Sequence, residues 1–390
     1  MTEISPQMWD KLSPDATASA PPPPAPTYGQ EVRRRLLANK PAVVSIVFII
    51  ALIIAAFFGP MLSPHTYFRQ ELKLANIPPF FETYTVTDSA GDTTRFFLNA
   101  SNFNLYQVDA GGQVLGLLRG GRKDILKKSQ PYEFGDQALT LDYSSLPARL
   151  LLEDGTELRP SGWNWNRTYL FGTDQLGRDI LVRQLYGAQI SLTVAFVATL
   201  VNFFIGVFYG GIAGYMGGKV DAVMMRIVEV ISTIPLTLYV VLLMVVFDSG
   251  LLSIIIAIGS VFWVDMARIV RGQILGLKSQ DYVAAARTMG ASPARILTKH
   301  LLPNSIGPII VTLTMLIPSA IFIESFMSFI GLGVTPPLAS WGSLTSEAVE
   351  TLRAYPHQLF FPATAISLTM FAFNFLGDGL RDALDPKVRG

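Results

Sequence analysis

Apolar residues gather in six long runs along this chain, each bounded by polar or basic stretches. A bilayer core about 30 Å thick takes roughly 20 helical residues to cross, and a helix satisfies its backbone groups within the segment. The pattern therefore predicts six membrane-spanning helices. They lie near Ala42–Leu62, Ser191–Gly211, Val228–Phe247, Leu251–Ala267, Ile306–Phe326 and Leu359–Phe375.

Between the first two apolar runs the pattern changes to short alternating segments. Asn104–Val108 and Gln113–Leu118 flank an Asp-Ala-Gly-Gly turn, and Ala148–Leu152 and Glu157–Arg159 flank a turn with Asp-Gly at its centre. Alternation interrupted by such turn residues is typical of β-hairpins. The sequence therefore predicts a β-rich insert over residues 63–189. The insert is either a structural spacer or a contact for an external partner.

Composition narrows the class of protein. Half of the 390 residues are hydrophobic, 15% are charged, and the net charge is +1, which is typical of a polytopic membrane protein and gives no sign of a nucleic-acid partner. Cysteine is absent, so disulfides and thiolate metal sites are excluded. The histidines His65, His300 and His357 are too far apart in sequence to suggest a metal cluster.

Basic residues set the expected orientation. Arg33, Arg34, Arg35 and Lys40 stand directly before the first span, and positive residues favour the cytoplasmic side. Both termini are therefore expected in the cytoplasm, with the insert outside. The expected domains are a Pro-rich tail and basic segment over 1–40, a first span over 41–62, the insert over 63–189, and a core over 190–390 with a cytoplasmic loop at 268–305.

The segment from Asp281 to Pro303 carries the most informative local pattern. Three alanines, good helix formers with minimal side chains, precede Gly290, which suits the left-handed residue that closes a helix. Ser292 and Pro293 have the types expected at the N-cap and first position of a second helix, and Pro303 ends the unit. Two short basic helices of this kind either link two spans or present a surface to a soluble partner.

This segment also resembles the EAA loop of bacterial ABC importer permeases. The resemblance rests on Ala284-Ala285-Ala286-Arg-Thr-Met-Gly290, followed after nine residues by His300-Leu-Leu-Pro303. Ala284 stands where glutamate is common in that family, and His300 where isoleucine is common. Further blocks are similar to C-type subunits of peptide permeases. They are Gly172–Asp179, Gly214–Asp221, Glu324–Gly333 and Asn374–Pro386.

The resemblance implies an all-α polytopic membrane protein of the type I ABC importer permease class, with six transmembrane helices and the β-rich insert between helices 1 and 2. It implies a multi-pass subunit of the bacterial cytoplasmic (inner) membrane, in contact with lipid, that imports oligopeptides or dipeptides. The implied partners are a B-type permease subunit, two ABC ATPases and an extracytoplasmic peptide-binding protein. The chain itself would be non-catalytic and without cofactor, because ATP and magnesium would bind the ATPases.

Candidate site residues follow from these comparisons and from charge within the apolar runs. Those expected to contact the ATPase are Ala284, Ala285, Ala286, Arg287, Gly290, Ala291, Ser292, Arg295, His300 and Pro303. Candidates for a pathway or gate are Arg178, Asp179, Asp265 and Glu324, since charge within the membrane is expensive and often functional.

Structural alternatives stand beside these roles. Asp265 can pair with Arg268 and Glu229 with Arg226 at helical spacing, and Arg178 and Asp179 can cap a helix. Trp163, Trp165 and Trp341 suit an interfacial belt.

Competing functions predict other patterns. A secondary transporter would show internal repeats, which the two halves lack, and a membrane enzyme would cluster acids, bases or metal ligands at one depth. Importers of nickel or other small solutes share the same sequence blocks, so they remain an alternative to peptide transport.

Overall fold

The computed structural model describes residues 27–100, 102–247 and 250–385. Most of the predicted Pro-rich tail lies outside this range, as does Pro386. Within the described residues, five helices are long and apolar enough to cross a membrane, or up to six if one bent pair counts as a span. The five are α2 (Lys40–Leu62), α3 (Ile180–Met216), α6 (Leu251–Leu277), α10 (Ile306–Phe329) and α12 (Pro356–Leu384).

The predicted span Val228–Phe247 is not a single helix. It falls on α4 (Gly218–Ser232) and α5 (Leu236–Phe247), and the two axes differ by 81°. Pro235 lies at the break, where its ring removes a backbone donor and disfavours helical geometry in Ile234. The exact count of six transmembrane helices is therefore not confirmed, although the mostly helical membrane fold is.

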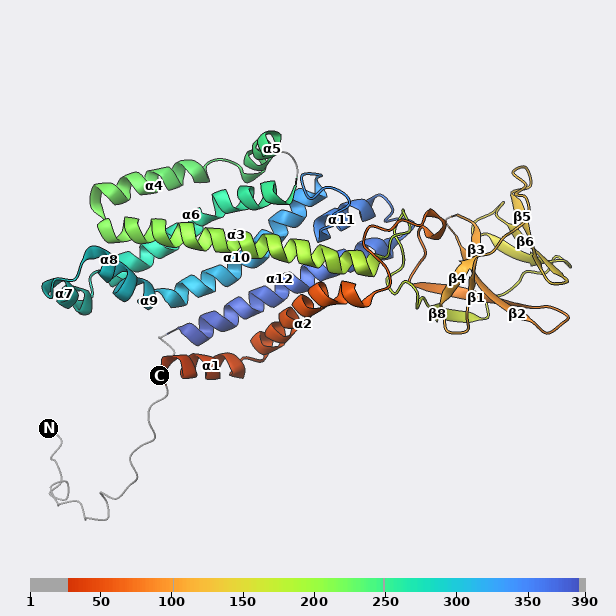
Figure 1. Cartoon of the computed structure of the whole chain (residues 1–390), viewed down its shortest axis with the longest axis horizontal. Coiled ribbons are helices and arrows are strands. Elements are labelled where there is room, and N and C mark those ends of the chain that lie inside the picture. Colours follow the sequence, from red (N-terminus) through yellow and green to blue (C-terminus); the bar gives the residue numbers. More distant parts are fainter. Residues whose placement is uncertain (1–26, 101, 248–249, 386–390) are drawn as a thin grey trace, which may run out of the picture.

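The spanning helices form a bundle (Figure 1). Its core is made mainly of small and aliphatic side chains, with Trp341 and Phe373 also buried there. Helix α3 packs along α6 at very short range: a Cβ at Gly210 would lie 2.3 Å from the Ala267 carbonyl oxygen. No side chain fits there, so glycine is needed for this approach, as in other tightly packed membrane helices. Helix α3 begins at Ile180, so its first turns fall within the range predicted for the insert.

Shorter helices lie at the two ends of the bundle. The end that carries the α3 C-terminus also holds α1 and α7 to α9, and the opposite end holds α11 beside the insert (Figure 1). We call them the α7 end and the insert end. The bounds are α1 (Tyr28–Ala38), α7 (Asp281–Thr288), α8 (Pro293–Ile296), a π-helical turn (Leu297–Leu301), α9 (Leu302–Asn304) and α11 (Trp341–Val349).

The insert after α2 is β-rich, as predicted. A five-stranded antiparallel sheet has the order β4-β3-β2-β1-β8, and a three-stranded sheet has the order β5-β6-β7. An apolar cluster that includes Phe96, Leu105, Tyr132 and Leu139 joins them. The strands are β1 (Phe80–Thr87), β2 (Thr93–Asn99), β3 (Asn104–Val108), β4 (Val114–Leu117), β5 (Ser129–Phe134), β6 (Gln137–Asp142), β7 (Arg149–Leu152) and β8 (Gly162–Trp165), and a short 3-10 turn spans Leu72–Leu74.

One predicted hairpin is confirmed and the other is only partly formed. Strands β3 and β4 pair as expected. Strand β7 instead pairs along its length with β6, while Glu157 makes a single bridge to Leu151. The Asp-Gly turn is present, with Leu152 N–H donating to the Thr156 carbonyl at 2.9 Å. The pairing of β7 with β6 could not be inferred from the local sequence pattern.

Candidate functional site

The segment 281–303 forms two short helices joined by a closed turn at the α7 end of the bundle. Gly290 has φ +81°, a conformation that costs other residues about 1–2 kcal/mol. Its N–H donates to the Arg287 carbonyl at 2.9 Å, and Ala291 N–H donates to the Ala286 carbonyl at 3.0 Å. This pair of bonds is the Schellman motif that ends a helix. The turn is thus fixed by backbone bonds.

The second helix begins as the sequence predicts. Ser292 is the N-cap of α8, where its hydroxyl accepts a hydrogen bond from Arg295 N–H at 3.3 Å, and Pro293 follows in the first turn. Capping of this kind typically contributes about 1 kcal/mol. The helix–glycine–helix geometry therefore has a cause at each of its positions.

One face of the segment packs into the bundle. Val283, Ala286, Ile296 and Leu301 are buried in a cluster with side chains of α6 and α10, among them Met266, Val270 and Ile309. Burial of apolar area contributes about 25 cal/mol per Å². A displacement of the segment must therefore displace α6 and α10 as well, unless this apolar contact is lost.

The opposite face of the segment is open. Met289 is 82% exposed, and the Arg287 guanidinium lies 5.8 Å from the centre of the Tyr215 ring on α3. Of the residues predicted to contact an ATPase, Ala286 is buried and Ala291 and His300 are half-buried. The exposed ones are Ala284, Ala285, Arg287, Gly290, Ser292, Arg295 and Pro303. The exposed set forms a surface of small and basic residues.

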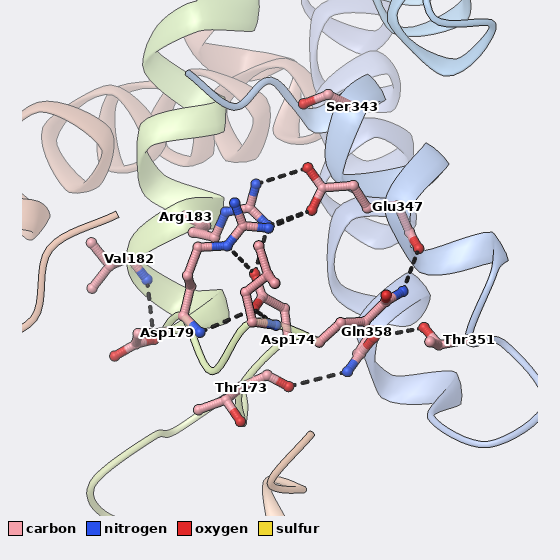
Figure 2. Close-up of polar contacts among 12 residues, drawn as sticks. Thr173, Asp174, Asp179, Val182, Arg183, Ser343, Glu347, Thr351 and Gln358 are labelled. Atoms are coloured by element: carbon pink, nitrogen blue, oxygen red, sulfur yellow. Dashed lines mark hydrogen bonds and ion pairs between the residues drawn. The ribbon is translucent and has the colours of Figure 1, made fainter. Parts of the chain in front are cut away.

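At the insert end, two acidic and two basic side chains form an ion-pair cluster (Figure 2). Arg183 Nη1 lies 2.7 Å from both Asp174 Oδ2 and Glu347 Oε2. Arg178 Nε lies 2.7 Å from Asp174 Oδ2, and its Nη2 lies 2.8 Å from Glu347 Oε2. Arg183 is 2% exposed, so its charge depends on these partners.

The ion-pair cluster joins segments far apart in the chain. Asp174 and Arg178 precede α3, Arg183 lies in its first turn, and Glu347 comes from α11. Burial alone would raise the pKa of Glu347, but the hydrogen bonds and charges of Arg183 and Arg178 lower it below the usual value. Glu347 is therefore an ionised partner of both arginines at neutral pH.

Gln358 of α12 extends this contact to the insert. Its side-chain amide donates to Asn76 Oδ1 at 2.9 Å and to the Thr173 carbonyl at 3.1 Å, and its oxygen accepts from Thr351 (Figure 2). The start of α3, the start of α12 and the insert are thus held together by polar side chains.

Asp179 takes no part in the ion pairs. It is the N-cap of α3, where Oδ1 accepts from Leu181 N–H at 2.8 Å and from Val182 N–H at 3.3 Å. Burial raises its pKa, and the bond from Val182 opposes that rise.

Glu324 lies apart from the cluster, fully buried in α10. Its carboxylate accepts hydrogen bonds from Ser191 of α3 at 2.7 Å and from Ser328 at 2.8 Å. Ser191 in turn accepts from Trp341 N–H at 3.3 Å. Glu324 therefore joins α3, α10 and α11.

The remaining predicted pathway residue, Asp265, lies elsewhere. Its side chain is 67% exposed, at 3.5 Å from Arg268, and Glu229 pairs likewise with Arg226 at 2.8 Å. The predicted pairings at helical spacing are both confirmed. The four predicted pathway residues are therefore not brought together in one site.

Sequence reasoning missed two features of the insert end. Glu347 gave no signal, because its partners precede it by more than 160 residues. Trp341 is fully buried, with its indole N–H donating to the Gln184 carbonyl at 3.1 Å, so its prediction as an interfacial residue is wrong. Trp163 and Trp165 are exposed, but on β8 of the insert.

Comparison with known proteins places the chain in a family. Residues 206–390 match the family "Binding-protein-dependent transport system inner membrane component", and residues 27–79 match "N-terminal TM domain of oligopeptide transport permease C". The dipeptide transport system permease protein DppC of Bacillus subtilis is 40% identical over 94% of this chain and 88% of its own length. OppC, the oligopeptide transport system permease protein of the same organism, is 52% identical over 57% of this chain and 73% of its own length.

OppC of Escherichia coli K12 is 49% identical over 57% of this chain and 73% of its own length. Together with the two relatives from Bacillus subtilis, it places the similarity in one type of subunit. The chain therefore belongs to the inner membrane components of binding-protein-dependent transport systems, among the C-type permease subunits represented by OppC and DppC.

Proposed function

We propose that this chain is the C-type permease subunit of an ATP-driven importer of oligopeptides or dipeptides. Its family and the peptide-transport names of its relatives support this assignment. Permease subunits of this family form the membrane pathway, and ATP hydrolysis belongs to separate ATPase subunits. ATP and magnesium accordingly bind those partners and not this chain.

The assembly that we infer contains a B-type permease subunit, two ATPases and an extracytoplasmic peptide-binding protein. The α7 end faces the cytoplasm, with both termini, and the insert lies outside. This orientation is supported by Arg33, Arg34, Arg35 and Lys40, which lie on or beside α1 at the α7 end (Figure 1), because basic residues favour the cytoplasmic side.

The observation that carries the proposal is the two-faced geometry of the segment 281–303. Its outer face exposes Ala284 and Ala285, over which a partner surface can approach the backbone closely. Its inner face buries Val283, Ala286 and Ile296 against the spanning helices. A unit that is open on one side and tightly packed on the other can transmit displacement from a soluble ATPase to the bundle.

The proposed mechanism follows from these contacts. When the ATPases close on ATP, they displace the segment, and α6 and α10 move with it because the apolar contact keeps them together. The turn at Gly290 keeps α7 and α8 in a fixed relation, so both helices move as one body. The result is a change in how the two permease subunits enclose the pathway.

Site-specific cross-linking tests the ATPase contact. The chain has no native cysteine, so Ala285→Cys introduces a single thiol on the exposed face of α7. In the reconstituted complex we expect a bifunctional reagent to join this thiol to an ATPase subunit. Ser145→Cys, exposed on the insert, is the matched control and is expected to give no such product. An ATPase adduct from Ser145→Cys, or none from Ala285→Cys, would contradict the proposal.

Transport itself tests the substrate class. Proteoliposomes that contain the whole assembly should accumulate a labelled peptide only when ATP and the loaded binding protein are both present. Accumulation of nickel with no accumulation of peptide would replace the peptide assignment with a small-solute importer. Uptake of peptide without ATPase subunits would refute the ATP-driven mechanism altogether.

A further inference from the structure

One loop of the insert exposes two large aliphatic side chains at its tip. The loop joins β4 to β5, and we call residues 119–128 the basic loop. Ile125 is 84% exposed and Leu126 is 96% exposed. Single exposed apolar residues are ordinary, but this adjacent pair is flanked in the sequence by five cationic side chains that are all exposed. These are Arg119, Arg122, Lys123, Lys127 and Lys128.

The positive charge of the basic loop is not neutralised by ion pairs within the described part of the chain. None of these five cations forms an ion pair with any residue that the structure describes. The loop's one acid, Asp124, accepts hydrogen bonds from Leu126 N–H and Lys127 N–H, both at 3.0 Å. Elsewhere in the insert acidic residues outnumber basic ones. The loop is therefore a localised positive patch.

The loop is also ordered without a partner. Asp124 and Ser129 form an antiparallel bridge, with N–H to carbonyl distances of 2.9 Å and 3.1 Å. Gly121 N–H donates to the Pro131 carbonyl at 2.8 Å, and the Gln130 amide donates to the Gly121 carbonyl at 3.1 Å. A contact surface that is already folded loses little conformational entropy when it binds.

The position of the loop favours a protein partner over a lipid surface. The insert extends away from the bundle along the long axis of the molecule, with β5 in its outer part (Figure 1), and the loop ends where β5 begins. A bilayer around the spanning helices would lie on the bundle side of the insert, away from β5. Leu115 on the edge strand β4, which precedes the loop, is also 58% exposed.

We propose that the basic loop docks onto an acidic surface of the extracytoplasmic binding protein, with Ile125 and Leu126 in an apolar depression of that surface. This inference rests on the proposed function and assigns one surface to one of its partners. The cations attract the partner over a distance of about a Debye length, and the aliphatic pair provides the contact at short range. The insert then guides the loaded binding protein to the mouth of the pathway.

Binding measurements on the intact assembly test this proposal. The probe is the binding protein that copurifies with the transporter, and the assembly is held in nanodiscs of neutral phosphatidylcholine. At about 50 mM salt we expect Lys127→Glu with Lys128→Glu to weaken affinity about tenfold, mainly through slower association, because charges at an interface rim act on the encounter. The difference should shrink as salt is raised. Ile125→Ser with Leu126→Ser should instead speed dissociation.

The matched control is Arg149→Glu with Arg159→Glu, which changes the charge of the insert equally at exposed positions outside the loop. Equal affinities for this control and the lysine variant would overturn the proposal. Loss of binding to phosphatidylglycerol vesicles by the lysine variant, with unchanged affinity for the binding protein, would overturn it in favour of lipid. If the wild-type assembly binds no such protein at all, the proposed function fails first, which is a distinguishable result.

Discussion

The two ends of the bundle are held by different physical means. At the α7 end, segment 281–303 is held by apolar packing and by backbone bonds around Gly290. At the insert end, the ion-pair cluster buries the charges of Asp174, Arg178 and Arg183 beside Glu347. Apolar contacts are non-directional and tolerate small displacements, whereas buried ion pairs require close geometry and are costly to break. The α7 end is therefore expected to move more readily than the insert end.

The largest expected effect is on stability at the insert end. Glu347→Ala would leave the buried Arg183 without one of its two anionic partners. Breaking a fully buried pair typically costs about 3–5 kcal/mol, and the cost here should be smaller, because the Glu347 side chain is 39% exposed and Asp174 remains. We expect a clear fall in the unfolding midpoint of the purified complex. The control is Glu229→Ala, which removes an exposed pair that is worth about 0–1 kcal/mol. Equal midpoints for the two variants would show that the ion-pair cluster stabilises the fold no more than an exposed pair does.

The next effect concerns coupling at the α7 end. Proline cannot adopt φ +81° and has no N–H to donate to the Arg287 carbonyl. Gly290→Pro should therefore change the orientation of α7 relative to α8. We expect ATPase stimulation by the loaded binding protein to fall by about tenfold or more, equivalent to about 1.4 kcal/mol, while membrane insertion persists. Deletion of Ala284–Ala286 should act in the same direction. Normal stimulation in either variant would refute the coupling role.

Acid should lower the stability of the insert end selectively. The pKa of Glu347 in the folded chain is below its ordinary value of 4.5, so the stability from its ion pairs is complete above that value. This stability is lost as the pH falls below about 4.5 and through the lower folded value. The unfolding midpoint of the wild-type complex should therefore fall more on acidification than that of Glu347→Gln. Parallel curves for the two proteins would show that this carboxylate is not the group responsible.

The smallest expected effect is that of Arg287→Ala on stability. Its guanidinium lies over the Tyr215 ring at 5.8 Å, and an exposed contact of this kind is worth about 0.5–1 kcal/mol. We therefore expect an unfolding midpoint close to that of the wild-type complex. A loss as large as that of Glu347→Ala would mean that the α7 end is as rigid as the insert end.

The periodicity and turn chemistry of the sequence predicted most of the helical fold and the local geometry of segment 281–303. Ser292, Pro293 and Gly290 act on residues within a few positions, so their effects could be inferred from spacing alone. The broken span was missed although Pro235 marked it, because the apolar run continues on both sides of the break. The local sequence pattern therefore predicted the structure best where the contacts that determine it are between residues close together in the chain.

Long-range pairs were beyond such reasoning. Glu347 contacts Arg183 only because α11 folds back against the start of α3. The sequence around either residue gives no indication of this pairing. Trp341 likewise has the composition of an interfacial residue, yet its burial depends on Gln184 and on the return of the chain after α10. These positions are decided by tertiary packing.

Helix α3 runs without interruption from the ion-pair cluster to the turn at Gly217. At 1.5 Å per residue, its 37 residues make a rod about 55 Å long. A tilt of about 10° about the ion-pair cluster would carry the opposite end of the rod through roughly 10 Å. A large displacement where Tyr215 meets Lys278 would thus correspond to only a modest rotation at the ion-pair cluster, so a movement applied at one face of the membrane would reach the other face much reduced in amplitude.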